Sequence, residues 1–198
     1  MFKKERIQVD EKLSDKIYKE IIKNIIDGTY SERDFISEAQ IATKYGVSKA
    51  PVKEALHILS EQGYIVRYPR RGYMINAYSR EEINQIQDIR RSLESLCLKK
   101  IIENASDSDI QSLIPEESSP EQAVDPRSTA NVSFHLGLAK LSGNPFLVDT
   151  LQKYIYIATI YNMSAAPDMN NFRHIVEALL KRDEEEAIKW LLTDIRYV

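Results

Sequence analysis

Cysteine and long apolar runs are scarce in this sequence, and each absence excludes a class of protein. Cys97 is the only cysteine among 198 residues, so no disulfide can form within the chain and nothing indicates an oxidising compartment. The longest apolar runs, such as residues 155–161, are far shorter than the roughly 18 residues that span a bilayer. The basic first residues lead into Asp10 and Glu11 rather than into an apolar stretch, which argues against a signal peptide. We therefore expect a cytoplasmic protein without a membrane-spanning segment.

Groups that carry out catalysis are also few. The sequence has 3 histidines, and it shows no nucleophile elbow, phosphate-binding loop or metal-ligand spacing. The enzymatic alternative depends on His135 and nearby carboxylates doing acid–base work inside a helical bundle. We expect that the protein is not an enzyme.

Acidic and basic residues are distributed unevenly along the chain. The net charge is −3, but residues 1–78 carry 14 Lys and Arg against 11 Asp and Glu, whereas residues 79–198 carry 13 against 19. The first part is therefore +3 and the second −6, which fits a DNA-facing half and an acidic half that faces elsewhere. Because the basic excess is modest, any affinity of the basic half for a polyanion such as DNA should depend on a local basic surface and on dimerisation.

Residues 38–59 have the pattern of a helix-turn-helix. A short helix is followed by Gly46, where a left-handed C-cap residue is needed. Ser48 can cap the next helix, which leaves Pro51 in the first turn, where its missing N–H has no intrahelical partner. Four apolar residues then recur at helical spacing. The residues that such a motif places in a major groove are Ser48, Lys49, Ala50, Pro51 and Lys53.

A basic hairpin follows this motif. Two short β-prone runs, residues 64–68 and 73–75, flank a turn that contains Arg70, Arg71 and Gly72, which is the pattern of a wing. Each feature alone is compatible with an ordinary solvated surface. The turn, the proline position, the hairpin and the basic residues agree with one another, and together they predict binding to a double-stranded DNA operator.

At these residues the chain resembles the GntR family of bacterial winged-helix regulators. The family has the motifs GVSRxPVREAL and P.RG, and this chain carries GVSKAPVKEAL at residues 46–56 and PRRG at residues 69–72. The resemblance implies a winged helix-turn-helix of three helices plus a β-hairpin, and we place this domain at residues 1–77. Lys49 and Lys53 replace two arginines of the family. Lysine carries its charge on a single ammonium group, whereas the planar guanidinium of arginine can donate two parallel hydrogen bonds. Bidentate recognition of guanine should therefore be weaker.

Residues 78–198 are predicted to be helical. Ser79 precedes an acidic first turn and opens a long helix to about Glu103. The apolar stripe expected for this helix consists of Ile83, Ile86, Ile89, Leu93, Leu96, Cys97 and Ile101. Residues 115–126 are rich in proline and acid and should form a loop. Further helices are expected at about residues 105–113, 128–141, 145–163, 169–181 and 183–195, which together predict an antiparallel helical bundle.

The order of these helices resembles the FadR-type effector domain, FCD, that often follows a GntR winged helix. The motifs that carry the resemblance are RRSLE at residues 90–94, NVSFH at residues 131–135 and SGNP at residues 142–145. In many such domains one aspartate and three histidines hold a divalent metal, which in turn binds a carboxylate ligand. The aligned positions here are Asn131, His135, Phe172 and Asp194.

Only one of these four positions keeps the family's residue, His135. His174 cannot replace the missing ligand, because it lies about 200° around the helix from Phe172. Two side chains and a neutral amide make a poor zinc site. We therefore expect no metal and no other cofactor.

Arg90 then becomes the candidate for ligand binding, because a buried guanidinium needs an anion to offset its desolvation. Either Asp194 is that anion and no ligand binds, or a small carboxylate effector binds in a pocket lined by Arg90, Asn131, His135 and Asp194. We predict a homodimeric, sequence-specific transcriptional repressor controlled by a small organic acid. Two alternatives stay open. The C-terminal bundle could serve only for dimerisation or protein interaction, and the winged helix could bind an acidic protein instead of DNA.

Overall fold

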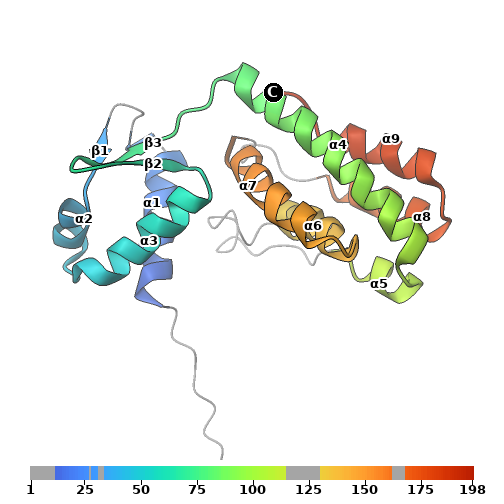
Figure 1. Ribbon diagram of the computed structural model, residues 1–198, viewed down its shortest axis with the longest axis horizontal. Helices are drawn as coiled ribbons and strands as arrows, with labels where there is room; N and C mark the ends of the chain where they lie inside the picture. The colour runs from blue at the N-terminus through green and yellow to red at the C-terminus, as the bar shows by residue number, and fades with distance from the viewer. Residues whose placement is uncertain (1–11, 27, 31–33, 115–129, 162–167) are drawn as a thin grey trace, which may run out of the picture. The chain divides into compact units, whose positions relative to one another are not determined.

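The computed structural model describes residues 12–26, 28–30, 34–114, 130–161 and 168–198 (Figure 1). Contacts between Cα atoms divide the chain into two compact units. Unit 1 comprises Met1–Glu61 and Ile65–Ile75, and unit 2 comprises Gln62–Tyr64 and Asn76–Val198. The loop predicted at residues 115–126 lies outside the described residues.

Unit 1 is a winged helix-turn-helix. Its helices are α1 (Leu13–Ile26), α2 (Glu38–Tyr45) and α3 (Lys49–Glu61), and its strands are β1 (Phe35–Ile36), β2 (Ile65–Tyr68) and β3 (Gly72–Ile75). The strands form an antiparallel sheet in the order β1-β3-β2. α3 packs against both α1 and α2. The buried residues at these contacts include Ile17, Ile21, Ile22, Ile41, Val52, Leu56 and Leu59.

The helix-turn-helix is fixed by its caps, as predicted for Gly46. At the start of α2, the Ser37 hydroxyl accepts the N–H of Gln40 at 3.2 Å, and the Gln40 amide oxygen accepts the N–H of Ser37 at 3.0 Å. At its end, Gly46 has a φ of 65° and its N–H points to the last carbonyls of the helix. α3 then begins at Lys49, so Pro51 is the third helical residue, where a proline is tolerated.

Strand β1 was not predicted, because two residues are too few to show alternation. It pairs with β3 so that Phe35 lies opposite Met74 and Ile36 opposite Tyr73. Gly72 permits this pairing. Its φ is 110°, and a Cβ placed on it would lie 2.5 Å from the carbonyl oxygen of Ile36. Glycine is therefore required for the close approach of β3 to β1.

Unit 2 is a helical bundle around a long central helix, α4 (Arg80–Asn104). α4 packs against α6 (Ala130–Leu141), α7 (Pro145–Tyr161), α8 (Met169–Leu180) and α9 (Glu184–Asp194), and the short α5 (Asp107–Gln111) contacts α8. Figure 1 shows α6 beside α7 and α8 beside α9. Ser79 caps α4, as its sequence predicted, and Glu82 completes a capping box with it. No helix among the described residues is both long and apolar enough to cross a membrane.

The buried face of α4 differs from the predicted stripe. Ile83, Ile86, Cys97 and Ile101 are buried, but Ile89 and Leu96 are 38% and 40% exposed. In their place three polar side chains point inward, namely Gln87, Arg90 and Glu94. Hydrophobic periodicity assigns polar residues to the surface. The predicted buried stripe of α4 therefore included the apolar residues Ile89 and Leu96 in place of the buried polar ones. These three buried polar residues are part of the candidate site of unit 2.

Candidate DNA-binding surface and effector site

The start of α3 presents the residues that were predicted to contact DNA. Ser48, Lys49, Ala50 and Lys53 are exposed, while Pro51 is half-buried. Within the described residues, neither lysine takes part in an ion pair. Both positive charges are therefore available to a phosphate or a base edge.

The hairpin ends in a tight turn that carries two exposed arginines. The N–H of Arg71 donates to the carbonyl of Tyr68 at 3.1 Å, and Arg70 has a left-handed backbone with a φ of 66°. A left-handed non-glycine residue costs on the order of 1 kcal/mol, and such strain is concentrated at functional sites. The guanidinium carbon of Arg71 lies 4.0 Å from the ring centroid of Phe35. Gly72 itself is half-buried against β1.

The two basic segments belong to one side of unit 1. Figure 1 shows the hairpin end and the start of α3 facing the same way, with α2 between them in this view. Four cations, Lys49, Lys53, Arg70 and Arg71, are carried by these segments. Such a distribution suits a duplex, whose phosphates run along both sides of the groove that a recognition helix enters.

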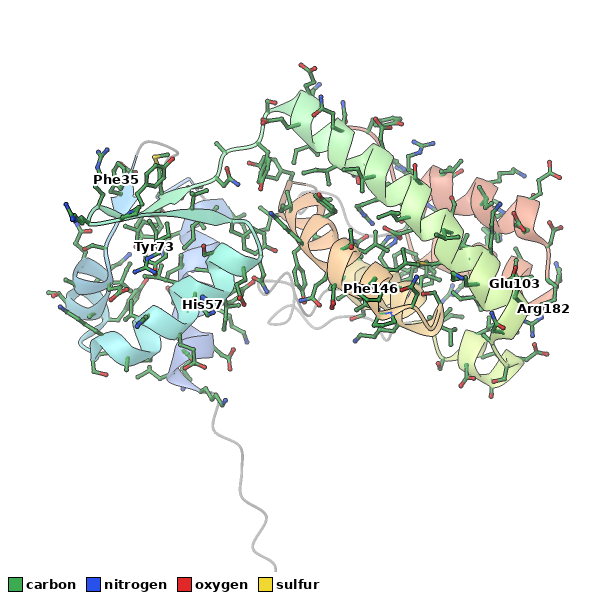
Figure 2. The ribbon with its side chains drawn as sticks, in the orientation of Figure 1. Phe35, His57, Tyr73, Glu103, Phe146 and Arg182 are labelled. Atoms are coloured by element: carbon green, nitrogen blue, oxygen red, sulfur yellow. The ribbon has the colours of Figure 1, made fainter. Side chains whose placement is uncertain are left out.

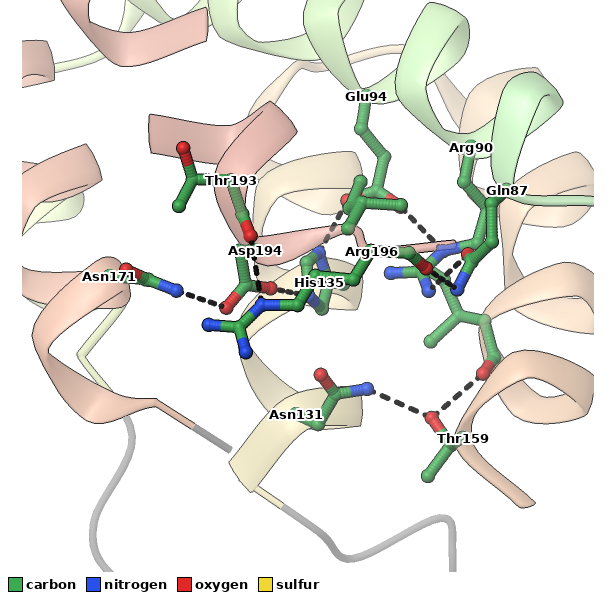
Figure 3. Close-up of polar contacts among 12 residues, drawn as sticks. Gln87, Arg90, Glu94, Asn131, His135, Thr159, Asn171, Thr193, Asp194 and Arg196 are labelled. Carbon is green, nitrogen blue, oxygen red and sulfur yellow. Dashed lines mark hydrogen bonds and ion pairs between the residues drawn. The ribbon is translucent and has the colours of Figure 1, made fainter. Parts of the chain in front are cut away.

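Unit 2 contains a chain of ionised side chains that joins three helices (Figure 3). On α4, the Nε of Arg90 donates to Oε1 of Glu94 at 2.9 Å. The other oxygen of Glu94 lies 2.5 Å from Nδ1 of His135 on α6. The Nε2 of His135 lies 3.0 Å from Oδ2 of Asp194, the last residue of α9. Arg90, Glu94 and His135 are almost completely buried.

Neutral amides extend this chain at both ends. Gln87 accepts Nη1 of Arg90 at 3.1 Å and donates to the carbonyl of Arg196 at 3.0 Å. Asn171 on α8 donates to the free oxygen of Asp194 at 3.3 Å. One donor is left over, since Nη2 of Arg90 is buried and no described residue accepts from it. Sequence reasoning did not assign Glu94, Gln87 or Asn171 to the site, although the i, i+4 spacing of Arg90 and Glu94 was a usable signal.

The contacts favour the ionised forms of Glu94, Asp194 and His135. Burial by itself raises the pKa of Glu94 and of Asp194, but His135 and Arg90, joined at Asp194 by the Asn171 hydrogen bond, together outweigh it, so the pKa of each carboxyl lies below its usual range. Burial and Arg90 lower the pKa of His135, yet Glu94 and Asp194 together raise it above its ordinary value. When these three groups are ionised, they and Arg90 make two cations and two anions, whose charges cancel.

Asn131 lies apart from this chain. Its amide nitrogen donates to Oγ1 of Thr159 on α7 at 2.9 Å. Phe172 is fully buried and its ring stacks on Phe134 with centroids 4.2 Å apart. His174 faces elsewhere, as predicted, and stacks on Trp190 at 4.1 Å.

A metal held at the four family positions does not fit these residues. Both ring nitrogens of His135 face carboxylates, which leaves no lone pair for coordination when the ring is protonated. A phenyl ring stands at the Phe172 position, and the Asn131 amide is engaged with Thr159. Across the described ranges no cluster of three or more His, Cys, Asp and Glu side chains could hold a metal ion.

A winged helix followed by a helical bundle is an architecture found among two-domain DNA-binding transcriptional regulators. The model for bacterial regulatory proteins of the gntR family matches residues 13–75, and the model for the FCD domain matches residues 85–196. The chain therefore belongs to the GntR family of DNA-binding transcriptional regulators and carries an FCD domain.

Relatives of similar length support this assignment. The chain is 26% identical over 193 residues to the HTH-type transcriptional regulator YdhC of Bacillus subtilis, which covers 91% of this chain and 86% of the relative. It is 23% identical over 169 residues to the Nta operon transcriptional regulator of Aminobacter aminovorans, covering 81% and 80%. A GntR transcriptional regulator from Rhodococcus sp. RHA1 has the same fold, with a TM-score of 0.66, 21% identity and coverage of 92% and 93%.

Proposed function

We propose that this protein is a homodimeric repressor whose two winged helices bind related half-sites of one operator. The observation that supports this most is the set of four exposed cations, Lys49 and Lys53 on α3 and Arg70 and Arg71 on the hairpin. One small winged helix that relies on lysine contacts binds DNA weakly. Two winged helices linked in a dimer bind more tightly, because binding of the first raises the effective concentration of the second. Residues 1–77 would bind DNA, and residues 78–198 would dimerise and respond to an effector.

The remaining proposed contacts are small or rigid residues at the same two places. Ser48, Ala50 and Pro51 leave room for α3 to approach the groove closely, and Gly72 holds the base of the wing against β1. These small, uncharged residues would contribute to the fit of the protein surface against DNA rather than to its positive charge. The proposed site of action is the cytoplasm, where an operator would be accessible.

Substitution of Lys49 tests the DNA-binding proposal. Lys49→Ala should cost about 1–3 kcal/mol of binding free energy, because it removes a contact at the groove. The probe is a 30-base-pair duplex that the wild-type protein has selected from a random library, and the readout is fluorescence anisotropy. Lys140→Ala, which removes an exposed cation from α6, is the matched control and should bind like wild type. Equal affinities for Lys49→Ala and wild type, with circular dichroism unchanged, would contradict the assignment.

We further propose a small organic acid as the effector, bound beside Arg90, Asn131, His135 and Asp194. The buried, unpartnered Nη2 of Arg90 supports it. Because Nε and Nη1 of Arg90 already have partners, one nitrogen remains to bind an oxygen of the acid. The acid would regulate only if it bound the DNA-competent and DNA-incompetent arrangements with different affinities.

One observation favours the alternative, a bundle that only dimerises or binds proteins. Glu94 already neutralises Arg90, so the site needs no external anion. Thermal unfolding with millimolar succinate, citrate or benzoate separates the two. A bound acid raises the melting temperature by mass action in wild type but not in Arg90→Lys, which keeps the charge and loses Nη2. Unchanged melting with all three acids would favour the bundle without a ligand.

A further inference from the structure

We propose that Phe35 is a positioning residue for DNA binding, because its ring holds the guanidinium of Arg71 in the orientation that contacts the duplex. This inference rests on the proposed role of the wing in operator binding. Figure 2 shows Phe35 on the short strand β1, next to the hairpin. Phe35 has no hydrogen-bonding side-chain group, so its contribution to binding would pass entirely through Arg71.

The ring of Phe35 is itself well fixed. Its backbone is paired with β3 opposite Met74, and its ring meets the ring of Tyr68 edge to face, with centroids 5.6 Å apart and an interplanar angle of 78°. The side chain is half-buried. Pairing on one side and an aromatic contact on the other leave the ring little freedom to turn away from the hairpin.

Arg71 is fixed at both of its ends. Its N–H closes the turn to Tyr68, and the next residue, Gly72, is pressed against Ile36 of β1. At the far end of the side chain, the guanidinium lies over Phe35 at 4.0 Å. Arg70 differs, because no ring lies under its guanidinium in the part of the chain that the structure describes.

Stacking of this kind prepares an arginine for recognition. The ring covers one face of the planar guanidinium, while the N–H groups project from its edge and stay free to donate to phosphate or base oxygens. An unrestrained arginine on a loop loses rotamer freedom when it binds, and a stacked one has already lost much of it. The wing therefore carries two different cations, a held Arg71 and a freer Arg70.

A double-mutant cycle tests this proposal by anisotropy, with the 30-base-pair duplex selected by wild type from a random library. Phe35→Leu should weaken binding about two- to fivefold, the size expected of an exposed cation–π contact. In the Arg71→Ala background the same substitution should cause no further loss. Phe35→Trp should retain wild-type affinity, since it keeps a ring beneath the guanidinium. Arg70→Ala provides the control cycle, in which the two losses should multiply.

Four results would overturn the proposal. An equal loss from Phe35→Leu in the wild-type and Arg71→Ala backgrounds would make Phe35 a structural residue only, and loss of affinity in Phe35→Trp as severe as in Phe35→Leu would do the same. An affinity unchanged in Phe35→Leu, while Arg71→Ala binds more weakly, would refute the positioning role and leave the wing's role standing. Full affinity in Arg71→Ala would refute the role of the wing itself. Circular dichroism and thermal unfolding of each variant confirm that it is folded.

Discussion

The ion chain of unit 2 shows how single residues depart from family expectation. Of the four positions where a metal was considered, His135 alone is a histidine, and it lies between two carboxylates, Glu94 and Asp194. Each buried ion costs several kcal/mol to desolvate, and only close, hydrogen-bonded partners offset that cost. Sequence reasoning placed Arg90, His135 and Asp194 in one site, and these three do belong to one connected chain. It did not show that Glu94, rather than Asp194, is the direct partner of Arg90.

The charge state of this chain predicts a pH dependence of stability. The pKa of His135 is raised above its ordinary 6.5, so its contribution is complete below about pH 6.5 and is lost as pH rises through the higher folded value. The lowered pKa values of Glu94 and Asp194 act oppositely, and their contribution disappears only as pH falls through those lowered values. The unfolding free energy should therefore be highest in mildly acidic solution.

Urea denaturation of wild type and His135→Gln from pH 5 to pH 9 measures this. The stability advantage of wild type should shrink above about pH 6.5, by up to about 1.4 kcal/mol per pH unit while folded His135 still holds a proton that the unfolded chain has lost. His174→Gln is the matched control, because that histidine is half-buried on α8 against Trp190 and lies outside the ion chain. An advantage that stays constant over the whole range would show that His135 is not held as a cation.

Among the elements, those with strong local signals were predictable and those defined by partners were not. Caps and apolar periodicity located α2 to α9 within a few residues, and Pro69 to Gly72 marked the hairpin. Strand β1 exists only because β3 pairs with it, and its two residues contain no pattern of their own. The buried side of α4 was misplaced because charged residues of the same chain satisfy one another there, which periodicity cannot detect.

Gly72 allows the dependence of the wing on β1 to be tested. Gly72→Ala should destabilise unit 1 by about 3 kcal/mol, because it adds overpacking against the Ile36 carbonyl to an unfavourable backbone conformation. Gly46→Ala is the control. Its backbone is also left-handed, but a Cβ there meets nothing within 4 Å, so only about 1–2 kcal/mol should be lost. Urea denaturation compares the two, and equal losses would show that the approach of β3 to β1 is not tight.

In the molecule as a whole, charge and architecture agree. The N-terminal part of the sequence is basic and forms the winged helix, while the acidic part forms the FCD domain. The uneven distribution of charge indicated that the chain has a basic and an acidic part. The motifs at residues 46–56 and 69–72 indicated the family. The operator sequence, the effector and the dimer surface each involve a second molecule. The sequence of one chain therefore determines only one side of each of these contacts. The proposed function nevertheless requires that the four cations of the winged helix bind one DNA duplex together.

The most direct measurement is an anisotropy titration of the wild-type protein with its selected duplex and with a scrambled duplex of equal composition, repeated from about 50 to 200 mM salt. Sequence-specific operator binding predicts a higher affinity for the selected duplex and a logarithm of the association constant that falls linearly with the logarithm of salt concentration. Equal binding to both duplexes, with no dependence on salt, would contradict it.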